Sequence, residues 1–401
     1  MITSSYPRYP GDGVGSFIHS LMRTLAQLEH IVTVLAPHDP AAVQEWQSEV
    51  DVRRVRFIWP DSWSVLGHAR SLSGDISLKW HAYPLVILFS LFAILGLWRE
   101  VRRQQPDVIY AQWLLPAGLI GAVASRLTGV PLVISVHGSD VFVAERRRIA
   151  RPAARFALRN CCHLIACSRD LARRAVKLGM RSDRVTTIPY GVDVERYKPD
   201  NELAQTLRAA LQLSEEQHVI MAMGRLVYKK GFSYLIEAMP GVLAQFPDAV
   251  LLIAGQGDLR TELELLADSL GIRQQVIFAG HVAWDQTSYY LAAADLLVLP
   301  SILDQAGNVD GLPNVLLESM ASGLAIVASK VAGVPDVMTD GENGLLVPEK
   351  DAEALAAAIC TLLRDPSLRQ RLGEAARATT LDHLSWTNVA KQVVAVLRSC
   401  E

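Results

Sequence analysis

The residues best suited to bind a ligand lie in segment 310–318, Asp-Gly-Leu-Pro-Asn-Val-Leu-Leu-Glu. The segment follows an apolar strand pattern at 295–300 and enters a predicted helix with Pro313 at its first position. Free backbone N–H groups at a helix start attract anions. The carboxylates of Asp310 and Glu318 accept hydrogen bonds from hydroxyl groups. A ligand with phosphate and hydroxyl groups, such as a sugar nucleotide, fits this pattern, but so does a capped helix with solvated acids.

Two cationic residues occupy another predicted strand-to-helix turn, in segment 224–231, Gly-Arg-Leu-Val-Tyr-Lys-Lys-Gly. Arg225 and Lys230 suit a diphosphate there, because a guanidinium forms paired hydrogen bonds with phosphate and an ammonium acts as a point charge. Exposed basic residues are also common in loops, so this turn alone does not decide the function.

Three more candidates lie where strands are predicted to end. His137 directly follows an apolar run and precedes a glycine, and ligands of parallel sheets bind beyond the carboxyl ends of the strands. Gly13 and Gly15 lie in a loop between a very short first strand and a helix, where glycine lets the backbone approach a ligand closely.

Short apolar runs rich in β-branched residues alternate with helical patterns along the whole chain. We predict strands at 31–36, 52–59, 107–111, 131–136, 163–167, 185–188, 219–223, 249–254, 275–278, 295–299, 325–328 and 344–347. This alternation is typical of an α/β protein with doubly wound parallel sheets. Because 401 residues exceed one ordinary core, we predict two domains, joined near the proline-bounded segment 188–199.

The composition favours a globular protein, since 50% of the residues are hydrophobic and 20% are charged. The five cysteines, of which Cys161 and Cys162 are adjacent, suggest neither a disulfide framework nor a metal site. The first residues lack the basic and apolar regions of a signal peptide. We therefore expect a reduced, cytoplasmic protein.

The charge is divided unevenly between the halves of the chain. Residues 1–190 contain 23 Lys and Arg against 14 Asp and Glu, whereas residues 191–401 contain 16 against 27. A basic half suggests an anionic partner, either nucleic acid or a membrane surface. No nucleic-acid-binding motif is evident, so we expect no nucleic acid as a partner.

A membrane surface is supported by an uncharged apolar segment at 82–98, followed by Arg99, Arg102 and Arg103. A spanning helix needs about 20 apolar residues, and this one must return the chain to the same side, so we expect it to lie in the interface or to be buried on both sides. Arginines also recur every four residues at Arg147, Arg151, Arg155 and Arg159, which predicts a basic stripe on one helix. Together these features suggest peripheral contact with the inner face of the cell membrane.

Taken in order, the motifs resemble those of the family 4 retaining glycosyltransferases (glycosyltransferase group 1). The resemblance covers essentially the whole chain. Its carriers are the loop with Gly13 and Gly15 and segments 136–140, 188–193, 224–231, 255–257, 276–280, 310–318 and 343–348. It implies the GT-B fold, in which two facing Rossmann-like domains enclose an interdomain cleft.

The resemblance implies an acceptor-side domain at 1–190, onto which the C-terminal helix 385–401 packs back, and a donor-binding domain at 191–384. It further implies that Glu318 binds the nucleotide ribose and that Asp310 contacts the transferred sugar. The backbone around Leu312, Pro313 and Asn314 would complete the donor site.

In the same family pattern, Arg225 and Lys230 bind the diphosphate and stabilise the leaving nucleotide, without a metal or another cofactor. His137 lies near the sugar, while Gly13 and Gly15 approach the donor phosphate and the acceptor. The implied activity is transfer of a sugar from a nucleoside diphosphate to an acceptor. The basic, apolar first half suggests a lipid-linked acceptor or a growing polysaccharide.

Two residues depart from the family pattern. Asp310 is one methylene shorter than the usual glutamate, and Tyr190 replaces the usual asparagine of a Pro-Asn-Gly turn. The alternatives are a nucleotide-sugar 2-epimerase of similar fold, a non-catalytic two-domain ligand binder and a membrane-spanning protein. The paired cations and paired acids argue against the first two.

Overall fold

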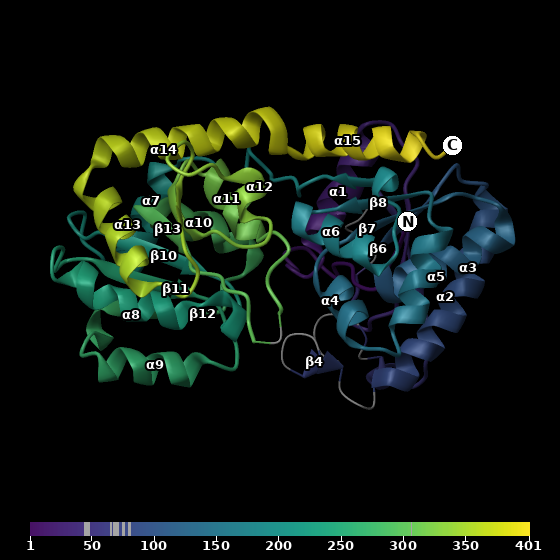
Figure 1. Ribbon diagram of the computed structural model, residues 1–401, viewed down its shortest axis with the longest axis horizontal. Coiled ribbons are helices and arrows are strands. Elements are labelled where there is room, and N and C mark those ends of the chain that lie inside the picture. The colour runs from purple at the N-terminus through teal and green to yellow at the C-terminus, as the bar shows by residue number, and fades with distance from the viewer. Residues whose placement is uncertain (44–48, 65, 67–71, 74–76, 79–81, 306) are drawn as a thin grey trace. The chain divides into compact units, whose positions relative to one another are not determined.

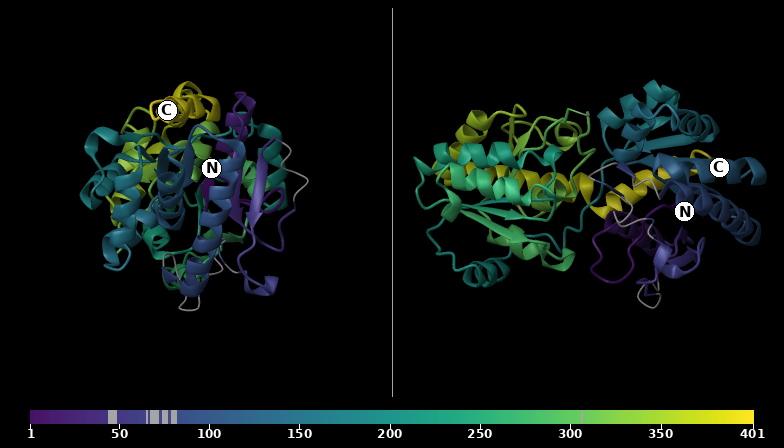
Figure 2. Two further views of the ribbon diagram at one scale, coloured as in Figure 1. Left: turned by 90° about the vertical axis from the view of Figure 1, so that its right-hand side faces the viewer. Right: turned by 90° about the horizontal axis from the view of Figure 1, so that it is seen from below.

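The computed structural model describes residues 1–43, 49–64, 66, 72–73, 77–78, 82–305 and 307–401. The chain forms two compact units, Met1–Gly191 together with Trp386–Glu401, and Val192–Ser385. Each unit contains a parallel sheet with helices packed on it, as the views in Figures 1 and 2 show.

The first unit contains a seven-stranded parallel sheet in the order β3-β2-β1-β6-β7-β8-β9. Its strands are β1 (Ile2–Thr3), β2 (Thr33–Pro37), β3 (Asp51–Val55), β6 (Ile109–Gln112), β7 (Leu132–Val136), β8 (His163–Ala166) and β9 (Val185–Thr187). Its helices are α1 (Ser16–Gln27), α2 (Ala82–Gln104), α3 (Leu119–Thr128), α4 (Ser139–Arg146), α5 (Arg151–Asn160), α6 (Arg169–Leu178) and α15 (Trp386–Arg398). Strands β4 (Leu72–Ser73) and β5 (Ser77–Leu78) form a separate antiparallel pair. The order of the sheet reverses between β1 and β6, as in doubly wound folds.

The second unit contains a six-stranded parallel sheet in the order β12-β11-β10-β13-β14-β15. Its strands are β10 (Val219–Met223), β11 (Val250–Ala254), β12 (Val276–Gly280), β13 (Leu296–Leu299), β14 (Ala325–Ser329) and β15 (Leu345–Val347). Its helices are α7 (Asn201–Ala210), α8 (Phe232–Leu243), α9 (Arg260–Ser269), α10 (Thr287–Ala293), α11 (Asn314–Ala321), α12 (Val334–Val337), α13 (Ala352–Arg364) and α14 (Pro366–Thr379).

Every strand that the alternation predicts is present, and the ends agree within two residues except at 52–59. That strand stops at Val55, because β3 is an edge strand whose partner β2 ends at Pro37, opposite Val55. The agreement follows from burial on both faces, which makes the strands of a parallel sheet continuous apolar runs.

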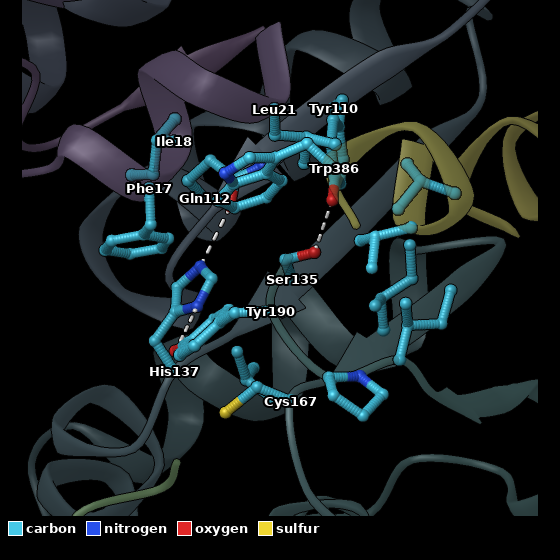
Figure 3. A pocket seen from close by; sticks show the side chains of 16 residues that line it. Phe17, Ile18, Leu21, Tyr110, Gln112, Ser135, His137, Cys167, Tyr190 and Trp386 are labelled. Atoms are coloured by element: carbon cyan, nitrogen blue, oxygen red, sulfur yellow. Dashed lines mark hydrogen bonds between the residues drawn. The ribbon is translucent and has the colours of Figure 1, made fainter. Parts of the chain in front are cut away.

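Helix α15 belongs to the first unit although it lies at the end of the chain. Its Val389, Ala390 and Val393 are buried in one core with residues of α1. Figure 3 shows Trp386 beside the same pocket as Ile18 and Leu21 of α1. A Cβ atom at Gly191 would lie 2.5 Å from the Trp386 ring, so this position tolerates only glycine without movement.

Helix α2 is apolar on two faces that have different surroundings. Phe89, Ala93, Leu97 and Val101 are buried against α3 and the strands β2 and β3. The opposite face exposes apolar side chains at Ile87, Leu91, Phe92 and Leu95. The helix is long and apolar enough to cross a membrane by length and composition alone, and only 22% of its apolar window is buried. The alternative of burial on both sides is therefore wrong.

The predicted arginine stripe is interrupted. Helix α4 ends at Arg146, and Arg147 is its C-cap residue with extended backbone angles, so it does not continue into α5. Only Arg151, Arg155 and Arg159 share α5, where all three are exposed. The four-residue spacing did not reveal this break, because spacing carries no information about where a helix ends.

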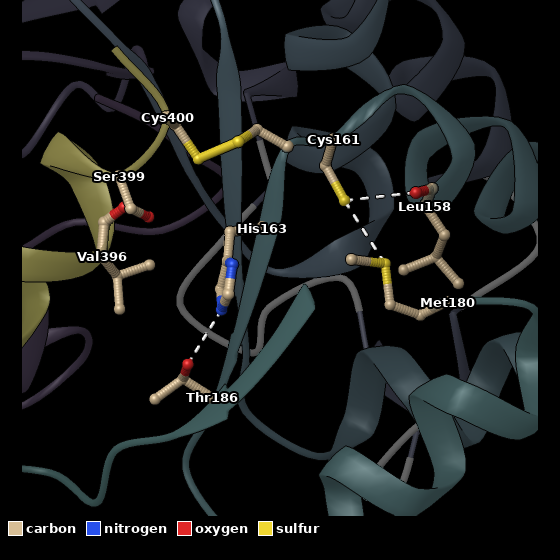
Figure 4. The surroundings of a disulfide bond; sticks show 9 residues. Leu158, Cys161, His163, Met180, Thr186, Val396, Ser399 and Cys400 are labelled. Atoms are coloured by element: carbon tan, nitrogen blue, oxygen red, sulfur yellow. Dashed lines mark hydrogen bonds between the residues drawn. A yellow bond between two sulfur atoms is a disulfide. The ribbon is translucent and has the colours of Figure 1, made fainter. Parts of the chain in front are cut away.

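The expectation that the cysteines remain reduced is wrong for one pair. Cys162, just before β8, and Cys400, just after α15, form a disulfide across 238 residues of sequence (Figure 4). The neighbouring Cys161 is buried as a free thiol and donates to the carbonyl oxygen of Leu158. The pairing depends on α15 returning to the first unit, which cysteine spacing alone does not reveal.

A cavity of about 730 Å³ lies beside Met1, at the amino ends of β2 and β6. Strand β1 pairs Ile2 with Leu35 on one side and with Ala111 on the other, so it separates β2 from β6 for only two residues. The Met1 ammonium is buried next to the cavity, and desolvation lowers its pKa to about 5. Ile31, at the same edge, is 98% exposed.

This geometry predicts that Val-Ile-Val inserted directly before Met1 stabilises the protein. By register, the three residues would face Ile31–Thr33 on β2 and Asp107–Ile109 on β6, all of which line the cavity. The insertion would bury apolar surface in the cavity, which should raise the Tm by about 3 °C or more. Differential scanning calorimetry against a Gly-Ser-Gly insertion measures the effect. Equal Tm values for the two insertions would contradict this account of the cavity.

Candidate active site

His137 lies at the carboxyl end of β7 in a pocket of about 30 Å³ that is lined mainly by aliphatic and aromatic side chains (Figure 3). Its Nδ1 atom is 2.9 Å from the Tyr190 hydroxyl, and its Nε2 atom is 2.8 Å from Oε1 of Gln112. Phe17 and Trp113 contact the ring edge-on, with centroids 5.1 and 5.2 Å away. Burial lowers the His137 pKa to about 3, so the imidazole is neutral at physiological pH. The neutral ring can donate one hydrogen bond and accept another, but it carries no charge.

The turn that presents His137 is held by the buried carboxylate of Asp140. The backbone N–H groups of His137 and Gly138 donate to it at 3.2 and 2.9 Å, and that of Leu114 donates at 2.7 Å. Asp140 thus joins the ends of two neighbouring strands, β6 and β7. Burial, the strongest influence, raises the Asp140 pKa despite these hydrogen bonds.

Gly13 and Gly15 lie in the loop before α1, as predicted, but only Gly15 shows a conformational need for glycine. Gly15 has φ +74°, and a Cβ there would lie 3.3 Å from the carbonyl oxygen of Ser5. Gly13 is exposed. Asp12 is buried between them and Arg8, and its carboxylate accepts from the Arg8 side chain at 2.7 Å and from Val14 N–H at 3.2 Å.

The predicted cationic turn of the second unit lies between β10 and α8. Lys230 extends over Gly224, where an added Cβ would lie 3.3 Å from the lysine Nζ. A Cβ at Gly255 would lie 1.8 Å from the carbonyl oxygen of Gly224, so the turns after β10 and β11 touch through their backbones. Arg225 is exposed in the same turn.

Asp310 forms ion pairs with two adjacent lysines rather than one. Lys229 Nζ is 2.8 Å from Oδ1 of Asp310, and Lys230 contacts Oδ2. The three side chains are only 12–15% exposed. Although burial acts in the opposite direction, Lys230 and Lys229 together hold the Asp310 pKa well below its usual range. The cluster carries two positive charges and one negative charge.

Helix α11 begins one residue later than predicted, at Asn314, so Pro313 is its N-cap residue and not its first helical residue. Leu312 and most of the helix are buried, which fixes the helix on the sheet. Glu318 lies in the second turn, next to Tyr197 and Arg196. Burial is the strongest influence on it and raises its pKa to about 7. Asp310 and Glu318 therefore have separate partners and opposite pKa shifts.

Gln112, Lys229, Tyr197 and the aromatic residues Phe17 and Trp113 beside His137 are not evident from the sequence patterns. Gln112 could have been found, because it directly follows the predicted strand 107–111, which pairs with the strand that precedes His137. Lys229 was adjacent to a predicted residue, but a sequence does not show which of two neighbouring lysines turns toward a distant aspartate. The contact of Tyr197 with Glu318 joins residues that are far apart in the chain.

Comparisons with known proteins agree with this architecture. Residues 204–379 match the family model described as glycosyl transferases group 1, and residues 11–196 match that described as glycosyltransferase family 4. The chain is 30% identical to a GDP-mannose-dependent monoacylated α-(1-6)-phosphatidylinositol monomannoside mannosyltransferase of Corynebacterium glutamicum, covering 100% of this chain and 97% of the relative. It is 32% identical to a GDP-mannose-dependent α-(1-6)-phosphatidylinositol monomannoside mannosyltransferase of Mycolicibacterium smegmatis, covering 68% and 71%.

Solved structures of similar fold cover nearly the whole chain. An Anabaena protein in complex with UDP has a TM-score of 0.76 at 22% identity and covers 99% of both chains. A sucrose-phosphate synthase from Thermosynechococcus elongatus has a TM-score of 0.80 at 21% identity and covers 99% of this chain and 98% of its own.

The raised pKa of Glu318 predicts a pH-dependent cost in stability. A carboxyl group that titrates near 7 when folded and near 4.3 when unfolded lowers the free energy of unfolding as the pH rises through that interval. Glu318→Gln should therefore match the wild type near pH 4 and exceed its free energy of unfolding at pH 8, by at most about 4 kcal/mol. Urea denaturation at both pH values measures the difference. A Gln variant that is less stable than the wild type at pH 8 would contradict this assignment.

Proposed function

The chain belongs to glycosyltransferase family 4, group 1, with the GT-B fold, and on this premise we propose that it transfers a sugar from a nucleoside diphosphate with retention of configuration. The observation that carries the proposal is the cluster of Lys229, Lys230 and Asp310 beside the glycine turns of the second unit. This cluster is buried and positively charged, and it lies beside turns in which glycines leave the backbone uncovered. Such a place suits a diphosphate, which can then approach the backbone closely.

In the proposed mechanism, the second unit holds the donor. Negative charge develops on the diphosphate as the bond to the sugar breaks. Arg225 and Lys230 stabilise that charge, so this role requires no metal or other cofactor. Glu318 accepts hydrogen bonds from the ribose hydroxyls, and Asp310 contacts the transferred sugar. The backbone at Leu312, Pro313 and Asn314 completes the donor site beside the start of α11.

The first unit provides the acceptor side. Burial keeps His137 neutral, so it forms hydrogen bonds with hydroxyl groups of the reacting sugar and contributes no charge. To contact a substrate, His137 must replace its hydrogen bond with Tyr190 or its hydrogen bond with Gln112. The loop containing Gly13 and Gly15 approaches the donor phosphate and the acceptor.

The nature of the donor and acceptor is supported by the relatives. Both mannosyltransferases named above are described as dependent on GDP-mannose and as acting on phosphatidylinositol mannosides. The Anabaena protein has been solved with UDP and with UDP-glucose. We infer a nucleotide-sugar donor and a lipid-linked acceptor.

The proposed roles predict the effects of three substitutions. His137→Ala, Lys230→Ala and Glu318→Ala should each lower the transfer rate by about 100-fold or more, because each removes a group that contacts the donor or the reacting sugar. Far-UV circular dichroism checks that each variant is folded, and Lys198→Ala, at an exposed position in the same unit as Lys230, is the control. Wild-type activity in any of the three would exclude that residue from the mechanism.

The donor is identified by a thermal-shift panel of UDP-, GDP- and ADP-sugars, since a ligand that binds only the folded state raises the apparent Tm. The active donor should shift the wild type and fail to shift Lys230→Ala at the same concentration. The absence of a shift with all of the sugar nucleotides would count against a glycosyltransferase.

We further propose a peripheral location on the cytoplasmic face of the membrane, with the exposed face of α2 in the lipid interface. Leu91 is 61% exposed and Ile87 64% exposed on an apolar helix face, and the basic residues Arg102 and Arg103 follow at the end of the helix. Apolar side chains flanked by cations suit a surface of anionic lipids.

This location predicts that Ile87→Asp with Leu91→Asp weakens binding to vesicles that contain anionic phosphatidylglycerol. Charged groups on the face of α2 would oppose its insertion, and co-sedimentation should fall by about tenfold or more. Leu265→Asp, at a similarly exposed leucine of α9, is the matched control. Unchanged co-sedimentation of the double variant would refute contact through α2.

A further inference from the structure

The ion pairs of Asp310 raise an electrostatic problem for a diphosphate site. A carboxylate in direct contact with Lys230 neutralises the cation that would bind the diphosphate, and it remains ionised because both lysines stabilise its charge. Asp310 thus competes with the diphosphate for Lys230. Burial strengthens this competition, because the three side chains are at most 15% exposed and water screens their charges little. One lysine with one aspartate would have no net charge.

Lys229 adds a second positive charge to the cluster, and its backbone is held in place. The turn Tyr228–Lys230 is anchored where Ile302 N–H donates to the Lys229 carbonyl oxygen at 2.8 Å. Gly231 follows with φ +68°, and a Cβ there would lie 1.9 Å from the carbonyl oxygen of Pro300. The turn after β10 is therefore pressed against the segment after β13, the neighbouring strand, and Asp310 lies further along that segment.

We propose that Lys229 is a positioning residue of the donor site, which binds Asp310 so that the charge of Lys230 remains available for the diphosphate. The two lysines hold separate oxygens of one carboxylate, Lys229 on Oδ1 and Lys230 on Oδ2. When a diphosphate binds, Lys230 turns from Asp310 to the phosphate oxygens, and Lys229 keeps the carboxylate paired. Asp310 is then not left as an unpaired buried charge, which would oppose the incoming anion. The inference rests on the proposed function, because it assigns the diphosphate to this cluster.

A single and a double variant test the assignment by calorimetric titration with UDP, GDP and inorganic pyrophosphate. Lys229→Gln should weaken binding of at least one probe by about tenfold, because Asp310 then pairs with Lys230 alone. Asp310→Asn combined with Lys229→Gln should restore the affinity to within about threefold of the wild type, since the competing carboxylate is gone. Lys198→Gln, at an exposed lysine of the same unit, should bind as the wild type does.

The possible outcomes separate this inference from the proposed function. If Lys229→Gln binds normally, or if the double variant binds no better than Lys229→Gln, Lys229 is not the counter-ion that keeps Lys230 available. If pyrophosphate is the only probe that binds, and the variants change its affinity as expected, the role of Lys229 is supported. The nucleotide part of the proposed function then fails. If none of the three probes binds the wild type, both fail. Unfolding of each variant is followed separately, so a loss of stability is not mistaken for a loss of binding.

Discussion

The parallel pairing of the strands is the constraint on which both candidate sites depend. In a parallel sheet all carboxyl ends lie on one edge, and the loops that leave them enter helices whose free N–H groups face the same way. His137 and Gln112 follow this rule at the ends of β7 and β6. Lys229 and Asp310 follow it after β10 and β13, which are also neighbours. Residues distant in sequence meet because their strands are adjacent.

Burial then sets the charge of each polar group. Desolvation disfavours ionisation, so His137 is neutral and Glu318 titrates near 7. Asp310 is comparably enclosed but remains ionised, because two lysines outweigh the cost of desolvation. Three groups in similar surroundings thus differ in charge according to their nearest partners. In the second unit, the different charges of Glu318 and Asp310 suit the proposed donor site, which must hold both the hydroxyls and the phosphates of one ligand.

Close backbone contacts make this arrangement possible. The turns after β10 and β11 approach until a Cβ at Gly255 would lie within 1.8 Å of the carbonyl oxygen of Gly224. Gly231 allows a similar approach to Pro300. In the first unit, Gly191 admits the ring of Trp386 and thereby lets α15 reach the core beside α1. The glycines act here by leaving space, and their neighbours supply the chemistry.

The sequence by itself determined the fold class and the strands, because a strand of a parallel sheet is buried on both faces and therefore appears as an apolar run. It also placed His137, Lys230 and Glu318 at strand ends and on a helix, since these positions follow from local patterns. Only the tertiary structure decided which groups touch, such as Lys229 with Asp310, Gln112 with His137 and Cys162 with Cys400. The break between Arg146 and Arg151 was also beyond the sequence pattern, because the end of a helix depends on its packing. Contacts between distant residues depend on the direction of each side chain and on what surrounds it, and neither is encoded in spacing along the chain.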